Sequence, residues 1–408
     1  MKRVARPFWG VFGISLLLTT ASAAQFRVAW QRTNNFEALS FDGLNSPIVK
    51  VDSRGNVYLA AVDGRIEGQG VLHDYVVVKR NALGRLLWQT HLPLGHQASV
   101  NAFELDRFGN AYITGSGGTA KFSASGRLAW AVPFGDREDG WKDFQDIGVD
   151  YAGNVYVTGH SLRDRNSLSS VVVTTIKYSA TGMQRWVQQY SGGQIYWSPS
   201  HQHVEVDESG DVYVAGEVRP HPAGGEEWAI IKYNGDGHEV WTRRYDGAGF
   251  ESVHDLALDR RGDLLITGYD GGNVTLKYDA DGNRLWEAHQ PAPGSGAKIG
   301  LDLFGNVYVR GWENDEETTT HSLLKFDSRG RHQWTRRLTS DFGWGHAFAV
   351  DNLGHAYLGA KLSIRKFDRS GRHVLTIPVR REASTMAVDR AGHLLESNPL
   401  TTTKFIAR

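Results

Sequence analysis

The sequence predicts an all-β protein that is built from eight copies of one four-stranded unit. Three observations lead to this prediction: an Asp-x-x-Gly motif that recurs eight times, a Lys-to-Trp motif with fixed spacing, and a last copy that the start of the chain can complete. Among the 408 residues, glycine occurs 47 times, and Trp, Tyr and Phe occur 13, 15 and 17 times. This mixture suits many short strands joined by tight turns.

The first motif is Asp-x-x-Gly followed by a polar residue and an apolar segment, and a typical copy reads DYAGNVYVTG at residues 150–159. Such a sequence suits a type I turn followed by a residue of positive φ, with the aspartate bonded to the backbone two residues on. We therefore expect one strand before each motif and another after it. The eight aspartates are Asp52, Asp106, Asp150, Asp207, Asp259, Asp302, Asp351 and Asp389.

The second motif is Lys, with Gly five residues later and Trp nine residues later. It predicts a third strand, a second tight turn and a fourth strand that ends on tryptophan. A seventh copy has Leu375 in place of Trp, and an eighth begins at Lys404 just before the chain ends. The six complete copies begin at Lys79, Lys121, Lys177, Lys232, Lys277 and Lys325.

The missing fourth strand of the last copy lies at the other end of the chain. The segment from Phe26 to Trp30 resembles a final strand and has no lysine segment before it. If it completes the last sheet, the sheets close into a ring and no blade is left incomplete. The sequence therefore predicts an eight-bladed β-propeller of four-stranded antiparallel blades. Seven blades is the alternative, if the degenerate last copy, LLESNPLTTTKF, does not form a sheet.

The first 23 residues have the pattern of a cleavable secretory signal. Lys2, Arg3 and Arg6 precede an apolar run from Phe8 to Leu18, and small residues follow before Ala24. We expect residues 1–23 to be a signal peptide and residues 24–408 to form a single propeller domain that is secreted, periplasmic or associated with the cell surface. An uncleaved membrane anchor is the alternative. Because the chain contains no cysteine, packing alone must hold the exported protein together.

The charge balance and the hydropathy of the chain exclude two classes of partner. The chain has 45 basic and 45 acidic residues, and this balance argues against a nucleic-acid binder, which normally has a basic footprint. No apolar run after the signal is long enough to span a membrane. We expect a monomer that binds a protein or a glycan.

The two rims of such a ring are predicted to differ. Turns after the first and third strands share one rim and are short, whereas the connections after the second and fourth strands share the other rim, here called the variable rim. Long connections on a rigid scaffold are where recognition usually lies, so we expect the ligand at the variable rim. Its longest connections are predicted at Ala61–Asp74, Pro133–Gln145, His160–Ser170, Tyr190–Ser200, Glu217–Glu226 and Trp312–His321.

Candidate ligand-binding residues fall at this rim. Tryptophans there suit stacking on sugars or anchoring a peptide, or else fill gaps between blades; they are Trp141, Trp197, Trp312 and Trp344. Polar residues at the start of predicted inner strands could ring the channel mouth and hold a metal or a polar ligand, or else be solvated or locally bonded; they are Asp146, His201, His203, His254, Asp255 and His346, with Lys298 at an equivalent place.

Other chemical motifs are absent or weak. The sequence has no G-x-S-x-G elbow, P-loop, HExxH or dinucleotide fingerprint. The segment from Asp279 to Asn283 only partly resembles a calcium loop, because its glycine comes early and no bidentate glutamate closes it. We predict no cofactor, with calcium or pyrroloquinoline quinone as alternatives. The regular lysines are expected to pair with turn carboxylates rather than to act in catalysis.

The repeats resemble the bacterial SBBP-type beta-propeller family, whose hallmark is Asp-x-x-Gly-Asn-x-Tyr-x-x-Gly followed by Lys-Tyr and a downstream Gly and Trp. The copies DRFGNAYITG and TLKYDADGNRLW carry this resemblance, which covers essentially the whole mature chain. It implies an exported or cell-surface propeller, and the family name implies seven blades. KYDADGNRLW is also similar, more loosely, to the tryptophan-docking segments of pyrroloquinoline quinone propellers, although its Asp-to-Gly spacing is one residue shorter.

The sequence is compatible with two functions. The first is a non-catalytic scaffold that binds a protein or a glycan through the variable rim. The alternative is an enzyme with its site at the channel mouth, either a quinoprotein dehydrogenase or a polysaccharide-acting lyase or hydrolase. The sequence favours the first.

Overall fold

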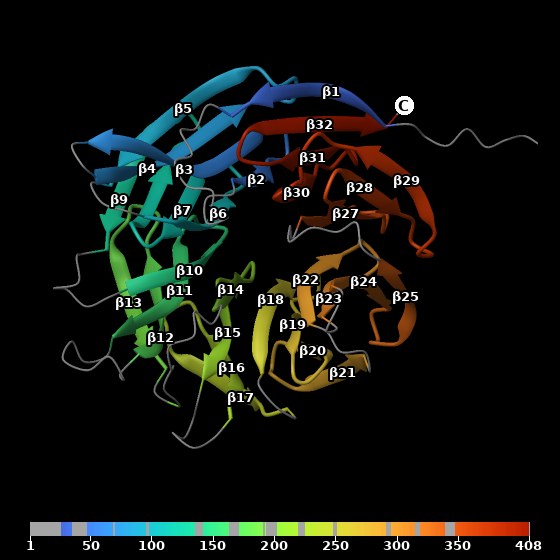
Figure 1. Ribbon diagram of the computed structural model, residues 1–408. Coiled ribbons are helices and arrows are strands. Elements are labelled where there is room, and N and C mark those ends of the chain that lie inside the picture. Colours follow the sequence, from blue (N-terminus) through green and yellow to red (C-terminus); the bar gives the residue numbers. More distant parts are fainter. Residues whose placement is uncertain are drawn as a thin grey trace, which may run out of the picture.

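The computed structural model describes residues 26–34, 47–67, 70–94, 98–134, 142–162, 171–190, 192, 202–218, 225–247, 251–290, 295–314, 319–338 and 347–407. These residues form eight four-stranded antiparallel sheets arranged as blades around a central axis, and they contain no helix (Figure 1). The predicted all-β fold and its eight blades are confirmed. The last copy does form a blade, so the seven-bladed alternative is wrong.

The blades follow one another along the chain, and each begins at the axis. Blade 1 contains β2 (Ile48–Val51), β3 (Val57–Glu67), β4 (Gly70–Arg80) and β5 (Leu86–Pro93), and blade 2 contains β6 (Val100–Leu105), β7 (Ala111–Gly115), β8 (Gly118–Phe122) and β9 (Leu128–Pro133). Blade 3 contains β10 (Lys142–Val149), β11 (Val155–Leu162), β12 (Val171–Tyr178) and β13 (Gln184–Gln189), and blade 4 contains β14 (His203–Val206), β15 (Val212–Val218), β16 (Glu227–Tyr233) and β17 (Glu239–Tyr245). Blade 5 contains β18 (Ser252–Leu258), β19 (Leu264–Tyr269), β20 (Asn273–Tyr278) and β21 (Arg284–Gln290), and blade 6 contains β22 (Ser295–Leu301), β23 (Val307–Asn314), β24 (Thr319–Phe326) and β25 (His332–Leu338). Blade 7 contains β26 (Phe348–Val350), β27 (Ala356–Ala360), β28 (Ser363–Phe367) and β29 (His373–Pro378), and blade 8 contains β30 (Thr385–Val388), β31 (Leu394–Ser397), β32 (Thr401–Ala407) and β1 (Phe26–Thr33).

Blade 8 is made from both ends of the chain. Strand β1 pairs with β32, with Val28 opposite Phe405 and Trp30 opposite Lys404, and Ala29 lies at a bulge between these pairs. Figure 1 shows β1 as the outer strand beside β32. The predicted closure of the ring by the N-terminal strand is therefore confirmed.

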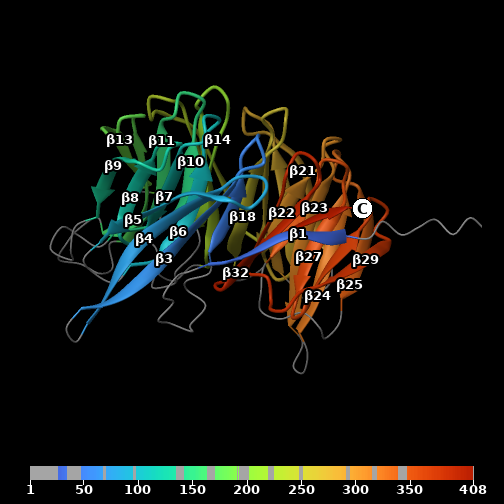
Figure 2. The ribbon, with the colours of Figure 1, turned by 90° about the horizontal axis from the view of Figure 1, so that it is seen from above.

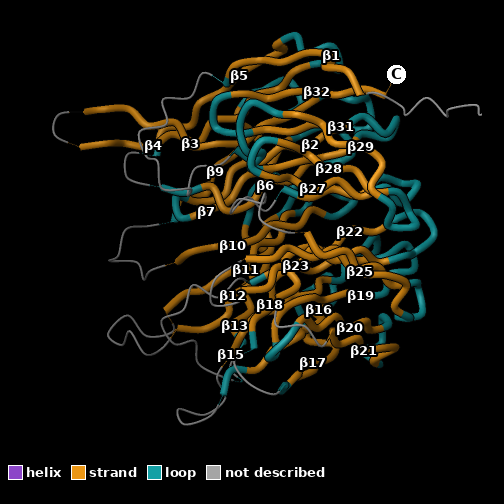
Figure 3. The backbone as a smooth tube through the Cα atoms, turned by 45° about the vertical axis from the view of Figure 1, so that its right-hand side comes forward, coloured by secondary structure: helices purple, strands orange, loops and turns teal. Residues whose placement is uncertain are grey.

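The short turns all belong to one rim, here called the turn rim. Each turn after a first or third strand spans five residues, and the amide of its fourth residue, a glycine of positive φ, donates to the carbonyl of its first residue. In most of these turns the side chain of the first residue accepts backbone N–H groups two and four residues on, as at Asp52. In Figure 3 these turns line the right-hand side, and the β3–β4 hairpin projects from the left.

The variable rim differs most from the prediction at two connections, Ala61–Asp74 and Trp312–His321, and both ends of the second one pair as parts of β23 and β24. Ala61–Asp74 was expected as a loop, but most of it extends β3 and β4, which are eleven residues each and pair from Val57–Arg80 to Glu67–Gly70. Eleven residue pairs make this the longest ladder among the described sheets. Figure 2 shows the resulting hairpin as a projection beyond the ring.

Neighbouring blades are joined by a repeated tryptophan contact. The Trp88 indole donates to the carbonyl of Ala124 in the next blade at 3.0 Å, and Lys79 donates to the same oxygen at 3.2 Å. The Lys79 ammonium also lies 4.7 Å from the centre of the Tyr58 ring. Because a Cβ atom at Gly126 would approach the Trp88 ring to 2.6 Å, the turn glycine gives the indole the room to dock. The other donors are Trp30, Trp130, Trp186, Trp241, Trp286 and Trp334.

The repeated lysines therefore do two things. Lys232, Lys277 and Lys404 pair with turn carboxylates, as predicted. Four others form no ion pair with a carboxylate of the described residues and donate instead to a backbone carbonyl of the next blade, so the predicted turn carboxylate partner is wrong for them; they are Lys79, Lys121, Lys177 and Lys325.

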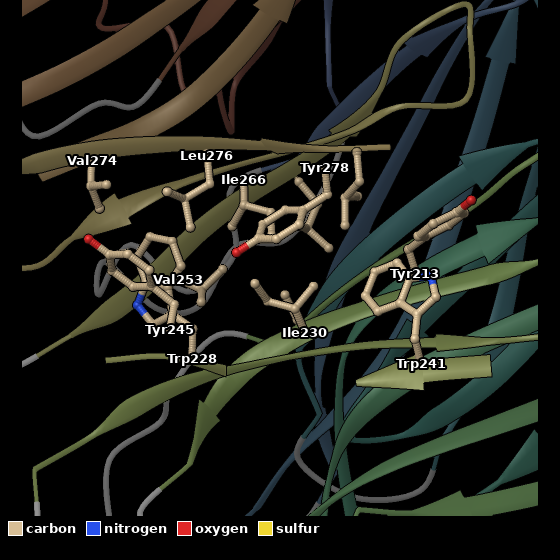
Figure 4. Close-up of a cluster of buried hydrophobic side chains, with 13 residues drawn as sticks. Tyr213, Trp228, Ile230, Trp241, Tyr245, Val253, Ile266, Val274, Leu276 and Tyr278 are labelled. Carbon is tan, nitrogen blue, oxygen red and sulfur yellow. The ribbon is translucent and has the colours of Figure 1, made fainter. Parts of the chain in front are cut away.

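The core lies between the blades. Figure 4 shows the cluster between blades 4 and 5, which includes Val253 and Leu276. Trp228 is fully buried there, and its ring centre lies 5.0 Å from that of Tyr245. Such flat apolar faces bury their area only against the next blade, so ring closure stabilises every interface.

Candidate functional site

A cavity of about 950 Å³ lies along the inner strands of blades 1 to 6. Its walls combine aliphatic side chains with charged and amide side chains. First strands run from the variable rim to the turn rim, so residues early in these strands lie toward the variable rim. The polar lining residues are Lys50, Ser99, Asn101, Glu104, Asp143, Gln145, Asp146, His203, Glu205, Asp255 and Lys298.

The structure brings together several residues that the sequence singled out. Each stands four residues before a repeat aspartate, and they form two pairs across neighbouring blades. Asp146 Oδ2 lies 3.6 Å from His203 Nδ1, and Asp255 Oδ1 lies 3.3 Å from Lys298 Nζ. All four line the cavity.

The two aspartates in these pairs also hold the blades together. Asp146 accepts the backbone N–H of Val204 at 3.0 Å, and Asp255 accepts that of Ile299 at 2.7 Å. Each carboxylate therefore bridges its own inner strand to the next one. Burial alone would raise the pKa of Asp146, but the hydrogen bonds and charge of His203 outweigh burial and hold this pKa below its ordinary value.

A second set of charged groups stands two residues before the repeat aspartates. Lys50 and Glu104 form an ion pair of 2.6 Å between blades 1 and 2. Glu205 is half-buried, and desolvation, with the negative charges of Asp146 and Glu104, raises its pKa to about 8. At neutral pH the side chain is therefore protonated and can donate a hydrogen bond into the cavity.

The sequence prediction missed this second set. A signal was present, because the equivalent position is glycine or alanine in the other blades: Gly148, Ala257, Gly300, Ala349 and Ala387. At the crowded axis a charged side chain has no packing reason to replace a methyl group. Lys50, Glu104 and Glu205 are the three exceptions.

An amide and carboxylate network lies toward the variable rim. Asn101 donates to Asp143 at 2.8 Å and to the carbonyl of Phe144 at 2.9 Å, and Gln145 donates to Asp143 at 2.8 Å. Nearby, the His160 ring nitrogen lies 2.6 Å from the Gln202 amide oxygen. Burial raises the pKa of Asp143 and lowers that of His160. This network orders polar groups of the kind that recognise hydroxyl and amide groups.

Two further predicted residues lie in strands. His254 is in β18, with Nε2 2.7 Å from the Ser252 hydroxyl, and it does not line the cavity. Trp312 is half-buried in β23, opposite His321, rather than in a loop. The remaining predicted residues fall outside the described part of the chain: Trp141, Trp197, His201, Trp344 and His346.

Within the described ranges, no three His, Cys, Asp or Glu side chains are grouped closely enough to hold a metal ion. The Asp279 carboxylate, considered above for calcium, accepts hydrogen bonds from the backbone of Asp281 and Asn283 and from the Asn283 amide. This is the same arrangement as in the other turns.

The chain matches no protein-family model, and no curated protein sequence is significantly similar to it. Its fold is that of known propellers. BamB from Moraxella catarrhalis superimposes with a TM-score of 0.62 over 93% of this chain and 99% of that chain, at 13% identity. The WD40 domain of Neurospora crassa Pan2 superimposes with a TM-score of 0.50 over 94% and 95% of the two chains, at 9% identity. At these identities the likeness shows the propeller fold alone. No helix in the described ranges is long and apolar enough to cross a membrane.

Proposed function

We propose that this protein is an exported, non-catalytic propeller scaffold that binds a protein or a glycan at its variable rim, next to the channel mouth. The observation that supports this most is the difference between the rims: short turns of one geometry on one, and connections of varied length on the other. Export is supported by the signal-like residues 1–23, and the SBBP-type resemblance is part of the same proposal.

The cavity along the inner strands supports this proposal, because it can hold part of such a ligand. Its volume of about 950 Å³ is at the upper end of what small-ligand sites enclose, roughly 300–1,000 Å³. Asn101 and Gln145 carry amides, and Asp143 carries a carboxylate, at the end of the cavity nearest the variable rim. Amides and carboxylates bind the hydroxyl groups of a sugar or the backbone of a peptide equally well.

A glycan array and a pull-down with the exported chain test this proposal. We expect Asn101→Ala combined with Gln145→Ala to weaken capture at least tenfold, because the Gln145 amide no longer reaches the ligand and Asn101 no longer orders Asp143 through its hydrogen bonds, at about 1 kcal/mol for each change. The control removes the same two side-chain types from exposed positions away from the cavity, with Asn352→Ala and Gln333→Ala.

Alanine variants of the four candidate tryptophans complete the series: Trp141, Trp197, Trp312 and Trp344. Unchanged capture by these variants and by the cavity double variant, beside a functional wild type, would contradict a binding site at this rim.

An enzyme remains the second candidate, because one observation favours it. Glu205 has a pKa of about 8, while the pKa of Asp146 is lowered, and both line the cavity. A protonated and an ionised carboxyl in one site is the division of roles that glycoside-hydrolysing enzymes use. Release of reducing sugar from a polysaccharide panel, abolished by Glu205→Gln, would support this candidate, and quinone titration tests the dehydrogenase form.

A further inference from the structure

The turn rim has surface chemistry that its uniform geometry does not require. Large apolar side chains stand at the tips of turns that follow the innermost strands. The four with exposed fractions of 60 to 63% are Phe108, Tyr151, Phe304 and Leu353. Leu83, in a turn of blade 1 farther from the axis, is 79% exposed. A turn tip can be any polar residue, so packing does not explain these side chains.

Arginine dominates the charges on the same rim. Only three acidic side chains in these turns are exposed: Glu208, Asp236 and Asp281. The exposed arginines are Arg54, Arg85, Arg107, Arg127, Arg260, Arg261, Arg329, Arg331, Arg369, Arg372 and Arg390. Arg331 and Arg372 pair with the first aspartate of their own turns. The exposed side chains of these turns therefore carry more positive than negative charge, above a layer of partly buried aspartates, although the whole chain is neutral.

The apolar tips form two groups on opposite sides of the ring. In blades 2 and 3, the Arg107 guanidinium lies 3.3 Å from the centre of the Tyr151 ring and 4.4 Å from that of Phe108. In blades 6 and 7, the amide of Leu303 donates to the carbonyl of Asn352 at 3.2 Å, which joins the turns that carry Phe304 and Leu353. Arginines occupy tips between the two groups, on blades 1, 5 and 8.

We propose that the turn rim docks onto the surface of an anionic lipid bilayer, with the ring axis roughly along the membrane normal. Turn tips from eight blades end on one rim, which lets many of them meet a flat surface at once. Guanidinium groups pair with lipid phosphates, and apolar tips enter the boundary between headgroups and acyl chains. This docking leaves the variable rim facing away from the membrane, so it does not depend on the proposed ligand there.

A bilayer fits this rim better than a nucleic acid does. Bases would stack on Phe108 and Tyr151, but they offer nothing to the aliphatic Leu83, Leu303 and Leu353. Hydrocarbon accepts all of these side chains. Opposite placement of the two apolar groups also suits a flat surface rather than a single strand.

Binding to vesicles of phosphatidylglycerol and phosphatidylcholine, measured by co-sedimentation with the chain from Ala24 onward, tests the proposal. This chain contains every described strand and lacks the apolar leader. We expect binding that is absent with phosphatidylcholine alone and that falls steeply with salt. Arg260→Glu with Arg261→Glu should weaken it about 25-fold or more, at about fivefold for each arginine.

Matched controls lie on the other rim. Arg380 and Arg381 are an adjacent exposed pair in the connection after β29, and Arg380→Glu with Arg381→Glu should leave vesicle binding within twofold. Leu353 and Leu362 are 61% and 63% exposed in the same blade, on opposite rims. Leu353→Ser should weaken binding about fivefold, whereas Leu362→Ser should not.

Two results would contradict docking on a bilayer. Failure of the wild-type chain to bind anionic vesicles, or equal losses for the two arginine pairs, overturns the proposal. If Leu353→Ser has no effect and a single-stranded DNA oligonucleotide binds as tightly as the vesicles, the rim is a general polyanion surface and the bilayer is wrong. Circular dichroism and thermal unfolding of each variant confirm that the ring is intact.

Discussion

Seven of the eight blade interfaces are joined by tryptophan docking, and the interface between blades 7 and 8 is not. There Leu375 replaces the indole. The reason lies in the acceptor: tryptophan docks on a carbonyl in the second tight turn of the next blade, and blade 8 has no such turn, because the chain ends meet at that point. A tryptophan at position 375 would have no turn to dock on.

The closing interface uses another aromatic residue instead. The Phe26 ring, from the N-terminal strand, packs edge-on to Tyr357 at 6.3 Å and lies 5.1 Å from the Lys366 ammonium. Phe26 and Leu375 belong to one apolar cluster with Phe405. The Lys-to-Trp motif therefore serves the contact between neighbouring blades. Its loss at Leu375 marks an interface with different contacts, whereas the blade itself still folds.

Trp241→Ala should have the largest effect. Trp241 is buried, donates to Ala280 at 3.0 Å and packs in the core between blades 4 and 5. We expect a loss of about 3–5 kcal/mol in the free energy of unfolding, against about 2 kcal/mol for Leu375→Ala at the interface without docking. Denaturant unfolding measures both, and equal losses would show that docking adds nothing to packing.

Gly126→Ala should cost about 3 kcal/mol. It combines strain at φ 85° with a Cβ that meets the docked Trp88 ring at 2.6 Å. Gly392 has a similar φ of 78° but nothing within 4 Å of an added Cβ, so Gly392→Ala should cost only about 1 kcal/mol. The difference between the two, from thermal or denaturant unfolding, isolates the docking contact from the backbone strain. A difference near zero would contradict docking.

Glu205→Gln should change how stability depends on pH, which Trp241→Ala should not. The carboxyl keeps its proton to about pH 8 in the folded chain but loses it near pH 4.5 when unfolded. The contribution of this carboxyl to wild-type stability therefore falls as pH rises from about 4.5 to about 8, and the glutamine variant should lack this fall. Above pH 8 we expect the glutamine variant to be more stable than the wild type by roughly 1–2 kcal/mol. The difference is no larger because solvent reaches part of this side chain. Parallel pH profiles of the two proteins would refute the raised pKa.

Leu375→Trp should have the smallest effect. Without a turn carbonyl to accept its N–H, the indole gains no docking contact and crowds the space that Phe26 uses. We expect a loss of about 1 kcal/mol rather than a gain. Stabilisation by this variant would mean that docking needs no turn in the next blade.

The fold was predictable because the repeat fixes local structure eight times over. Asp-x-x-Gly determines the turns, and the truncated copy at Lys404 with the orphan strand at Trp30 determines how the ring closes. The candidate site was only partly predictable. Asp146, His203 and Asp255 stand out as polar residues in apolar strands, but sequence does not show that the aspartates also bridge neighbouring strands.

Other features depend on contacts between blades that sequence spacing does not encode. The raised pKa of Glu205 comes first from burial at the axis and then from charges on blades 2 and 3, and the cation–π contact of Arg107 also spans blades 2 and 3. The extension of β3 and β4 also escaped prediction, because residues that continue a ladder resemble those of a long polar connection when no partner strand is known.

The most direct test of the account is a disulfide across the chain ends. The chain has no cysteine, and Arg27 lies opposite Ile406 in the β1–β32 pair, with neither side chain in the buried core. Arg27→Cys with Ile406→Cys should oxidise fully within one molecule and shift its mobility on a non-reducing gel, whereas Arg27→Cys with Arg185→Cys should not. Failure of the first pair to cross-link, or cross-links only between molecules, would contradict a ring closed by its two ends.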